Sequence, residues 1–320
     1  MKKIRLFFSI ILILSIVTYT TVNFTSDKAQ AAGNIYTNDT SFTLEVGHYK
    51  TIHIHGTSSR TYWHSSNSHV ASVTSGGKVT AVAPGSATIT ASVAGKKLIS
   101  KVTVLKINKK TLTLQAGKTD TLKITGPYTH VTWSTSNASV ATVSSKGVVT
   151  AKAPGTADIT ATVNGKNITS KVSVIKINNN SIVLELGGET GFVKTLHVDG
   201  TSSHITWTSN NNSVATVSSS GLVTAKGAGT ATITASVAGY KLTCKVEVVK
   251  VNYKEFTLKM GQTKKLKISG STSTVTWASN KHSVALVSSN GTVSTVSKGK
   301  ALIFGYVDGR RVISTVHVVD

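Results

Sequence analysis

The chain has 320 residues, a net charge of +23 and a single cysteine. One cysteine excludes an internal disulfide, so each folded unit must be held together by its apolar core. A charge excess of this size bears on association with anionic partners and carries no information about the fold.

Residues 1–31 have the pattern of a secretory signal peptide. Basic residues occupy positions 2, 3 and 5, an apolar stretch runs from Leu6 to Val17, and Ala29-Gln30-Ala31 resembles a small-residue cleavage site. The alternative is an uncleaved membrane anchor, because the apolar stretch can be extended to Val22. We favour cleavage, which predicts a secreted, extracellular or cell-surface-associated protein with no transmembrane segment in the mature chain.

The mature chain is predicted to be strongly cationic. It holds 31 basic and 11 acidic residues, a net charge of +20. The net charge of the four segments defined below is +5, +7, +1 and +7, counted from residue 34. The excess is therefore spread along the chain rather than gathered in a tail.

A unit of about 70 residues occurs four times. Tryptophans at 63, 133, 207 and 277 lie 70, 74 and 70 residues apart, and each opens a similar sequence. The clearest copy reads Trp133-Ser-Thr-Ser-Asn-Ala-Ser-Val-Ala-Thr-Val, then Gly147-Val-Val-Thr-Ala, then Gly155-Thr-Ala-Asp-Ile-Thr-Ala. A fixed period of this length predicts a tandem array, with repeats at 32–106, 107–176, 177–250 and 251–320.

Each repeat is predicted to be all-β. In the second copy, apolar residues alternate with polar ones, for example at Ala157, Ile159, Ala161 and Val163, and this period of two marks strands with one buried face. Glycine-containing dipeptides then predict tight hairpins; they are Ala94-Gly95, Asn164-Gly165, Ala238-Gly239 and Asp308-Gly309.

Two such sheets packed face to face would form a β-sandwich with a tryptophan between them. We expect Trp63, Trp133, Trp207 and Trp277 to be core residues, and the inward Ala87, Ala157, Ala231 and Ala301 to leave room for the indoles. The alternative role of the tryptophans is a platform on which carbohydrate stacks.

The Trp-x-Ser-x-Asn start, the Val-Ala-x-Val run, the Gly-x-Val-Thr-Ala strand and the Gly-Thr-Ala-x-Ile-Thr-Ala strand resemble the bacterial immunoglobulin-like domain, group 2 (BIG2). The resemblance covers residues 34 to 320. It implies four tandem immunoglobulin-like β-sandwich domains of the kind found in stalks of bacterial surface proteins, adhesins and phage tail proteins. The signal peptide disfavours the phage role.

The segments between repeats contain no Pro-rich or Gly/Ser-rich linker. They read Leu105-Lys-Ile-Asn, Ile175-Lys-Ile-Asn and Val249-Lys-Val-Asn, so the last strand of one repeat leads directly into the next repeat. Such short junctions predict an elongated, semi-rigid rod. With strands of about ten residues, a repeat spans about 35 Å and the rod about 140 Å.

Basic residues follow the tip glycine of each hairpin and form a predicted ladder of cations, to which the fourth repeat adds a lysine cluster. The predicted polyanion-binding residues are Lys96, Lys97, Lys166, Lys241, Arg310, Arg311, Lys264, Lys265 and Lys267. Anionic cell-wall polymer, acidic polysaccharide or extracellular DNA would bind them non-specifically. The alternative is that lysines on hairpins serve solubility and discourage edge pairing. Lysine outnumbers arginine, which favours diffuse attraction, and the absence of a nucleic-acid-reading motif argues against sequence-specific binding.

The fourth repeat also carries Leu302, Phe304 and Tyr306 where the other copies have small polar residues. This apolar stripe predicts a contact face for docking or self-association. The alternative is that a loop or neighbouring strand of the same repeat covers the stripe.

Three smaller features complete the pattern. Cys244 shares strand parity with inward valines, which predicts a small half-buried residue, the alternative being an intermolecular crosslink. Five histidines lie in the first repeat, where His53 and His55 are better explained as surface residues than as metal ligands. The third repeat has a four-residue insertion around 187–192.

No recurrent carboxylate pair and no catalytic motif occurs, so we expect neither enzymatic activity nor a cofactor. The sequence favours a non-catalytic spacer or adhesive rod that associates with anionic surface polymers. Two alternatives are a self-assembling subunit of a surface filament or layer and a receptor-specific adhesin.

Overall fold

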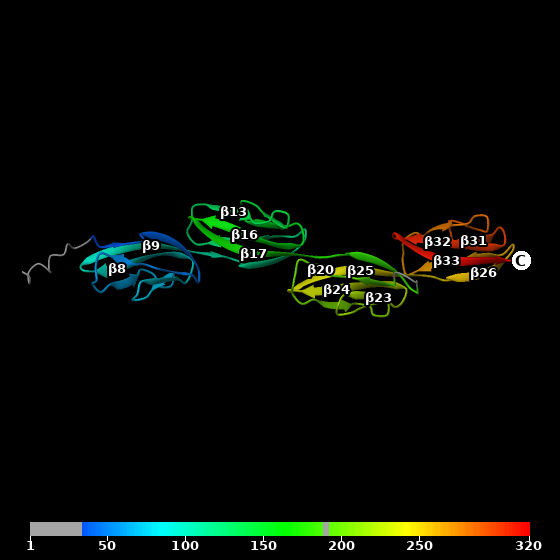
Figure 1. Ribbon diagram of the computed structural model, residues 1–320, viewed down its shortest axis with the longest axis horizontal. Helices are drawn as coiled ribbons and strands as arrows, with labels where there is room; N and C mark the ends of the chain where they lie inside the picture. The colour runs from blue at the N-terminus through cyan, green and yellow to red at the C-terminus, as the bar shows by residue number, and fades with distance from the viewer. Residues whose placement is uncertain (1–33, 188–191) are drawn as a thin grey trace, which may run out of the picture. The chain divides into compact units, whose positions relative to one another are not determined.

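The computed structural model describes residues 34–187 and 192–320, and the predicted signal peptide lies outside these residues. The described residues form strands, turns and loops, which confirms the all-β prediction (Figure 1). Across the two described ranges, no helix has the length and apolarity needed to span a membrane.

The first repeat forms two facing sheets. In the first sheet β2 (Ser41–Glu45) pairs in parallel with β9 (Lys96–Ile107), and β8 (Gly85–Val93) and β5 (Tyr62–Ser65) follow in antiparallel order. The second sheet has the order β3-β7-β6. The strands are β1 (Tyr36–Thr37), β2 (Ser41–Glu45), β3 (Tyr49–Thr51), β4 (Ile54–His55), β5 (Tyr62–Ser65), β6 (Ala71–Val73), β7 (Lys78–Ala81), β8 (Gly85–Val93) and β9 (Lys96–Ile107).

The other three repeats have the same strand order. The second contains β10 (Thr111–Gln115), β11 (Thr119–Thr121), β12 (Ile124–Thr125), β13 (Val131–Thr135), β14 (Ala141–Val143), β15 (Val148–Ala151), β16 (Gly155–Val163) and β17 (Lys166–Ile177). The third contains β18 (Ser181–Glu185), β19 (Val193–Thr195), β20 (Val198–Asp199), β21 (Thr206–Ser209), β22 (Ala215–Val217), β23 (Leu222–Ala225), β24 (Gly229–Val237) and β25 (Tyr240–Val251). The fourth contains β26 (Glu255–Lys259), β27 (Thr263–Lys265), β28 (Ile268–Ser269), β29 (Thr276–Ser279), β30 (Ala285–Val287), β31 (Thr292–Thr295), β32 (Gly299–Val307) and β33 (Arg310–Val319).

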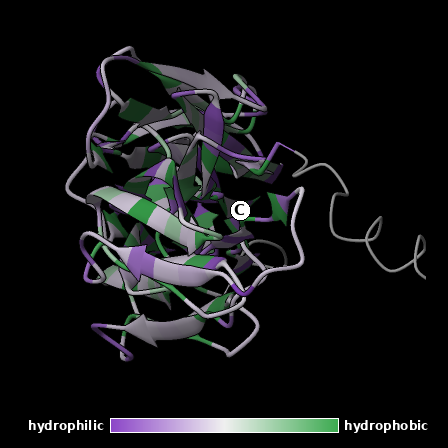
Figure 2. Cartoon of the chain, turned by 90° about the vertical axis from the view of Figure 1, so that its left-hand side faces the viewer, coloured by the Kyte–Doolittle hydropathy of each residue, from purple (hydrophilic) through white to green (hydrophobic). Residues whose placement is uncertain are grey.

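The alternating sequence of the strands produces the core. Along β24 every second residue is buried, from Ala231 to Val237, and the threonine and serine residues between them are half-buried. Green and paler bands accordingly alternate along strands in Figure 2. The core of the first repeat joins residues of both sheets, among them Val79 and Ile89, so the two sheets bury their apolar faces against each other.

The hairpin tips confirm the turn prediction. Ala94 and Gly95 have φ values of 48° and 76°, and the corresponding residues of the other repeats also have positive φ. Positive φ at both central residues is the geometry of a two-residue turn that matches the twist of the flanking strands. The insertion of the third repeat falls between β18 and β19, and its residues 188–191 lie outside the described part of the chain.

The prediction for the tryptophans needs two corrections. In the neighbouring strand of the same sheet, the residues paired with Trp63, Trp207 and Trp277 are Ala91, Ala235 and Gly305, respectively. The alanines at 87, 231 and 301 are buried but pair with valines of the long strands β9, β25 and β33.

The indoles also pack against the core without being enclosed by it. Trp63, Trp207 and Trp277 touch the core of their repeats, yet all four tryptophans are only half-buried. The physical reason is their position: β5, β13, β21 and β29 are edge strands, so one side of each indole has no neighbouring strand.

Candidate functional site

The junctions between repeats are built from continuous strands. Residues 101–105 of β9 pair with β2 in the first repeat, and Lys106 and Ile107 pair with β12 in the second. The ends of β17 and β25 pair in the same way with β20 and β28. The predicted boundaries at 106/107, 176/177 and 250/251 thus lie inside strands. Ile175 and Ile177 of β17 fill the core of the third repeat, so this long strand contributes to two repeats.

An asparagine directly follows each of the long strands β9, β17 and β25. The backbone N–H of Asn178 donates to the carbonyl of His197 at 3.1 Å, and its Oδ1 accepts from the His197 N–H at 3.1 Å. Asn252 makes the same pair of bonds with Lys267, at 3.0 and 2.9 Å. Asn108 does so with Lys123, and Asn38 does so with His53 in the first repeat. These asparagines tie the incoming strand to the sandwich that it enters.

Side chains add polar contacts at the junctions. Nζ of Lys110 lies 2.5 Å from Oε1 of Glu45, and Nζ of Lys254 lies 3.2 Å from Oε1 of Glu185. Both carboxylates are nearly buried. At the junction between the second and third repeats the matching positions hold Gln115 and Asn180. There the Tyr240 hydroxyl, on a hairpin of the third repeat, donates to the carbonyl of Thr113 in the second.

Close backbone approaches reinforce the junctions. A Cβ atom at Gly126 would lie 2.5 Å from the carbonyl oxygen of Val104, and one at Gly270 would lie 1.9 Å from that of Val248. Backbone atoms cannot move aside as a flexible side chain can, so only glycine fits at these positions. Short strand pairs, asparagine bonds and glycine contacts thus occur together at the end of a long strand.

The predicted cation ladder is less regular than the sequence suggested. Lys96, Lys97, Lys241, Lys265, Lys267 and Arg311 are exposed, whereas Lys166, Lys264 and Arg310 are half-buried. In the second to fourth repeats the residue directly after the tip glycine is half-buried, and in the third this residue is Tyr240, which contacts the preceding repeat. Lys264 lies over the ring of Tyr253, with Nζ 4.1 Å from the centroid.

The long strands carry a more regular set of cations, which the sequence analysis missed. Lys101, Lys171 and Lys245 are exposed at equivalent positions, and so are Lys106, Lys176 and Lys250. Their spacings of 70 and 74 residues equal those of the tryptophans, so the repeat period could have revealed them.

The predicted contact face lies on β32, beside residues of β33. Leu302 and Phe304 are half-buried and Tyr306 is 41% exposed, with the Phe304 and Tyr306 ring centroids 6.4 Å apart. The guanidinium of Arg311 covers part of Phe304 at 5.1 Å, and Ile313 is exposed beside it. Self-association through this face stays a prediction, which light scattering of the concentrated protein would test.

Cys244 is fully buried, and burial raises the pKa of its thiol to about 11. The inward orientation is therefore confirmed, but the side chain is fully buried rather than half-buried as predicted. A buried, protonated thiol is a poor nucleophile, so an intermolecular crosslink would require local unfolding.

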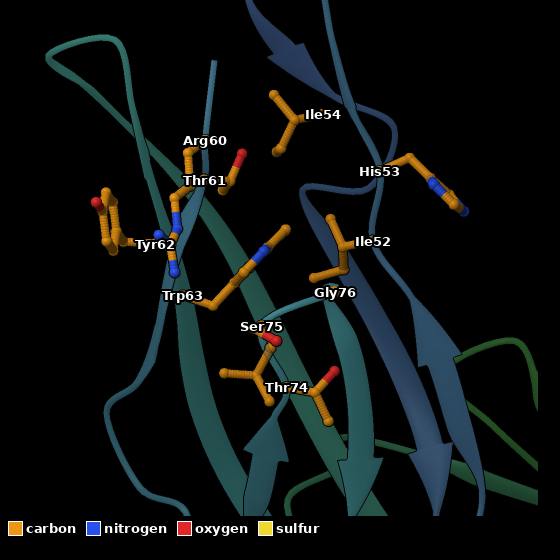
Figure 3. A pocket seen from close by; sticks show the side chains of 11 residues that line it. Ile52, His53, Ile54, Arg60, Thr61, Tyr62, Trp63, Thr74, Ser75 and Gly76 are labelled. Carbon is orange, nitrogen blue, oxygen red and sulfur yellow. The ribbon is translucent and has the colours of Figure 1, made fainter. Parts of the chain in front are cut away.

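A cleft of about 510 Å³ opens beside the tryptophan of the first repeat. It is lined by Trp63, the apolar Ile52 and Ile54, and the polar Arg60, Tyr62 and Thr74, among others. The indole lies at the centre of these side chains, and the ring of His53 points away from them (Figure 3). Within the described residues no group of three metal-binding side chains occurs.

Comparisons with known proteins place these features in context. The family model described as bacterial Ig-like domain (group 2) matches residues 34–98, 101–174, 171–244 and 245–309. Ice-binding protein 1 of Shewanella frigidimarina (strain NCIMB 400) is 29% identical over 290 residues, covering 75% of this chain and 32% of that protein. An uncharacterized protein of Clostridium acetobutylicum is 36% identical over 131 residues, covering 36% of this chain and 14% of that protein. The chain thus spans at most about a third of the length of these curated relatives.

Solved structures show similarity at low sequence identity. Domains 1–6 of the surface layer protein SbsC match 91% of this chain and 55% of that chain, with 17% identity and a TM-score of 0.21. Invasin, a bacterial integrin-binding protein, matches 81% of this chain and 72% of that chain, with 14% identity and a TM-score of 0.27. TM-scores of this size support no conclusion about domain arrangement or partners.

Proposed function

The chain belongs to the bacterial Ig-like domain (group 2) family, and on that premise we propose that it is a non-catalytic spacer or adhesive rod at the cell surface. In this proposal the rod is held to anionic surface polymers largely by charge. The strands that pass from repeat to repeat support the spacer role, because a junction without a linker bends little.

The observation that carries the charge proposal is the excess of exposed cations over carboxylates. The mature chain has 31 basic residues and 11 carboxylates, so at least 20 cations have no carboxylate partner of their own. Several of the carboxylates are already paired with lysines, including Asp39 with Lys50 and Asp320 with Lys298. The excess on the surface is therefore available to a polymer that carries many negative charges.

The absence of catalytic activity is part of the proposal. It rests on the family and on a structural explanation for the lowered pKa of Asp308. Proteins built from this kind of domain present surfaces and spacing rather than one reactive pocket. Asp308 lies at the hairpin tip of the fourth repeat, where side-chain hydrogen bonds from Ser273 and Ser271 lower the pKa of its carboxyl group. This shift therefore has a structural explanation.

A salt series tests the charge proposal. We expect purified residues 32–320 to be retained on isolated cell walls at about 0.05 M salt and released before about 1 M, because salt screens exposed charges. Replacing Lys101, Lys171 and Lys250 with Gln should move release to lower salt. A control with Gln at Ile99, Thr169 and Thr243, which are exposed uncharged positions on the same strands, should behave like the wild type.

Retention that is unchanged between about 0.05 and 1 M salt would contradict the proposal. Saturable binding whose affinity does not depend on the salt concentration would favour the receptor-specific adhesin instead. An equal shift in the lysine variant and in the uncharged control would show that the substitutions act through folding rather than charge.

A further inference from the structure

The cleft of the first repeat differs from its counterparts in the cations and aromatic rings around it. Arg60 lies over the ring of Tyr62, with the guanidinium carbon 5.4 Å from the ring centroid. Tyr62 is 64% exposed and Arg60 is exposed as well. Both residues also line an adjoining cleft of about 290 Å³ that Lys96 and Lys97 complete.

These two clefts adjoin each other and both are lined by cations. They share Arg60 and Tyr62, and neither lining contains an aspartate or a glutamate. Arg60 lines both clefts, Lys96 and Lys97 line the second one, and no carboxylate among the lining residues neutralises them. A ligand that complements this surface must carry negative charge.

The aromatic part of the surface indicates a ring with an apolar face. Trp63 is half-buried, so part of its indole faces the cleft beside Ile52 and Ile54 (Figure 3). The C–H face of a pyranose ring is apolar and of similar size, and removing both surfaces from water is favourable. Hydroxyl groups of Thr61, Thr74 and Ser75 line the same cleft and can exchange hydrogen bonds with sugar hydroxyls.

The equivalent cleft of the third repeat lacks this combination. It is about 230 Å³ in volume and is lined by Trp207 and His204, with no arginine or lysine. His204 and Thr206 stand where the first repeat has Arg60 and Tyr62. The second and fourth repeats have His130 with Thr132 and Thr274 with Thr276 at these positions, so the pair of cation and aromatic ring is specific to the first repeat.

We propose that this cleft binds an acidic saccharide unit, with its ring against Trp63 and its acidic group on the Arg60 guanidinium. Arginine suits this role because its planar fork pairs with carboxylate or phosphate through two hydrogen bonds. A saccharide is favoured over nucleic acid because hydroxyl-bearing residues line the cleft and can bond sugar hydroxyls, whereas non-specific binding of bases relies on stacking. This site rests on the proposed association with anionic polymers. It identifies the polymer as an acidic polysaccharide and the first repeat as the one that binds it.

The test compares the wild-type protein with a variant whose first repeat carries the residues of the third repeat at positions 60 and 62. A hexamer of galacturonate is titrated into residues 32–320 at pH 8, where a free histidine is neutral, and indole fluorescence is followed. The variant Arg60→His with Tyr62→Thr should bind at least about tenfold more weakly, since a charge-assisted pair is lost. Lys241→His removes one charge from an exposed hairpin of the third repeat and should change affinity less than about twofold.

Three results would overturn the proposal: equal losses in the two variants, equally tight binding of the methyl-esterified hexamer, or hexathymidylate bound more tightly with the same dependence on Arg60. If the double variant does not fold, Arg60→Gln alone decides between the same outcomes. Loss of salt-sensitive wall retention in the wild type would instead overturn the proposed function. If salt-sensitive wall retention is observed but the affinity for the hexamer does not depend on Arg60, only the proposed saccharide site is overturned.

Discussion

Replacing Trp207 with Ala should lower the free energy of unfolding of the third repeat by about 3 kcal/mol. The indole packs against the apolar core of that repeat, lies opposite Ala235, and has a ring atom 3.1 Å from where a Cβ of Gly221 would be. Its exposed edge places the cost near the lower end of the range for large aromatic residues. A unit of about 70 residues has little stability to spare, so this loss should unfold it at moderate denaturant concentrations.

Urea unfolding followed by circular dichroism and by the fluorescence of the other three tryptophans measures this effect. We expect a new early transition that involves about a quarter of the circular dichroism signal, because repeats in an array contact only their neighbours. The fluorescence should change little in this transition, since the third repeat of the variant has no tryptophan. Trp207→Phe should recover most of the stability, and Thr208→Ala, at an exposed position on the same strand, should have little effect. A change below about 1 kcal/mol for Trp207→Ala would mean that the indole is not part of the core.

Replacing Gly270 with Ala should open the junction between the third and fourth repeats. The φ of Gly270 is +96°, and an added Cβ would lie 1.9 Å from the Val248 carbonyl oxygen and 2.9 Å from the Gly229 nitrogen. Because both neighbours are backbone atoms, the short pairing of β25 with β28 must break. Amide exchange at Ile268 and Ser269 should accelerate by about 100-fold, which corresponds to a local loss of about 3 kcal/mol.

Gly261→Ala is the matched control for this prediction. Gly261 lies in the same repeat with a φ of +83°, but no atom lies within 4 Å of the point that its Cβ would occupy, so its substitution carries the backbone strain without the clash. We expect only a local effect at the turn between β26 and β27. If the two variants accelerate exchange at β28 equally, positive φ rather than close packing between repeats explains the result.

The class and repeat structure of the fold could be predicted because they depend on local patterns. Alternation of period two gives the faces of β24, and the dipeptides with a central glycine give the turns. Strand register is not local, and this is why the small residue opposite Trp63, Trp207 and Trp277 was assigned four residues too early. The half-exposure of the tryptophans follows from the edge position of their strands, which no sequence pattern within one repeat reports.

The candidate sites depend still more on contacts between distant residues. Tyr240 reaches Thr113 across a junction, so the burial of hairpin residues in one repeat depends on the repeat before it. The junction asparagines were visible as a period of 70, 70 and 74 residues, but their role becomes clear only when register places His197 opposite Asn178. The cleft of the first repeat likewise required knowing that Arg60 and Lys96 line adjoining surfaces.

Small-angle X-ray scattering of residues 32–320 tests the central claim most directly, namely that continuous strands join the four sandwiches into a semi-rigid spacer. A rod of four repeats predicts a maximum dimension of about 140 Å and a radius of gyration of about 40 Å. A radius of gyration near 19 Å, the value for a compact domain of this length, would contradict the account.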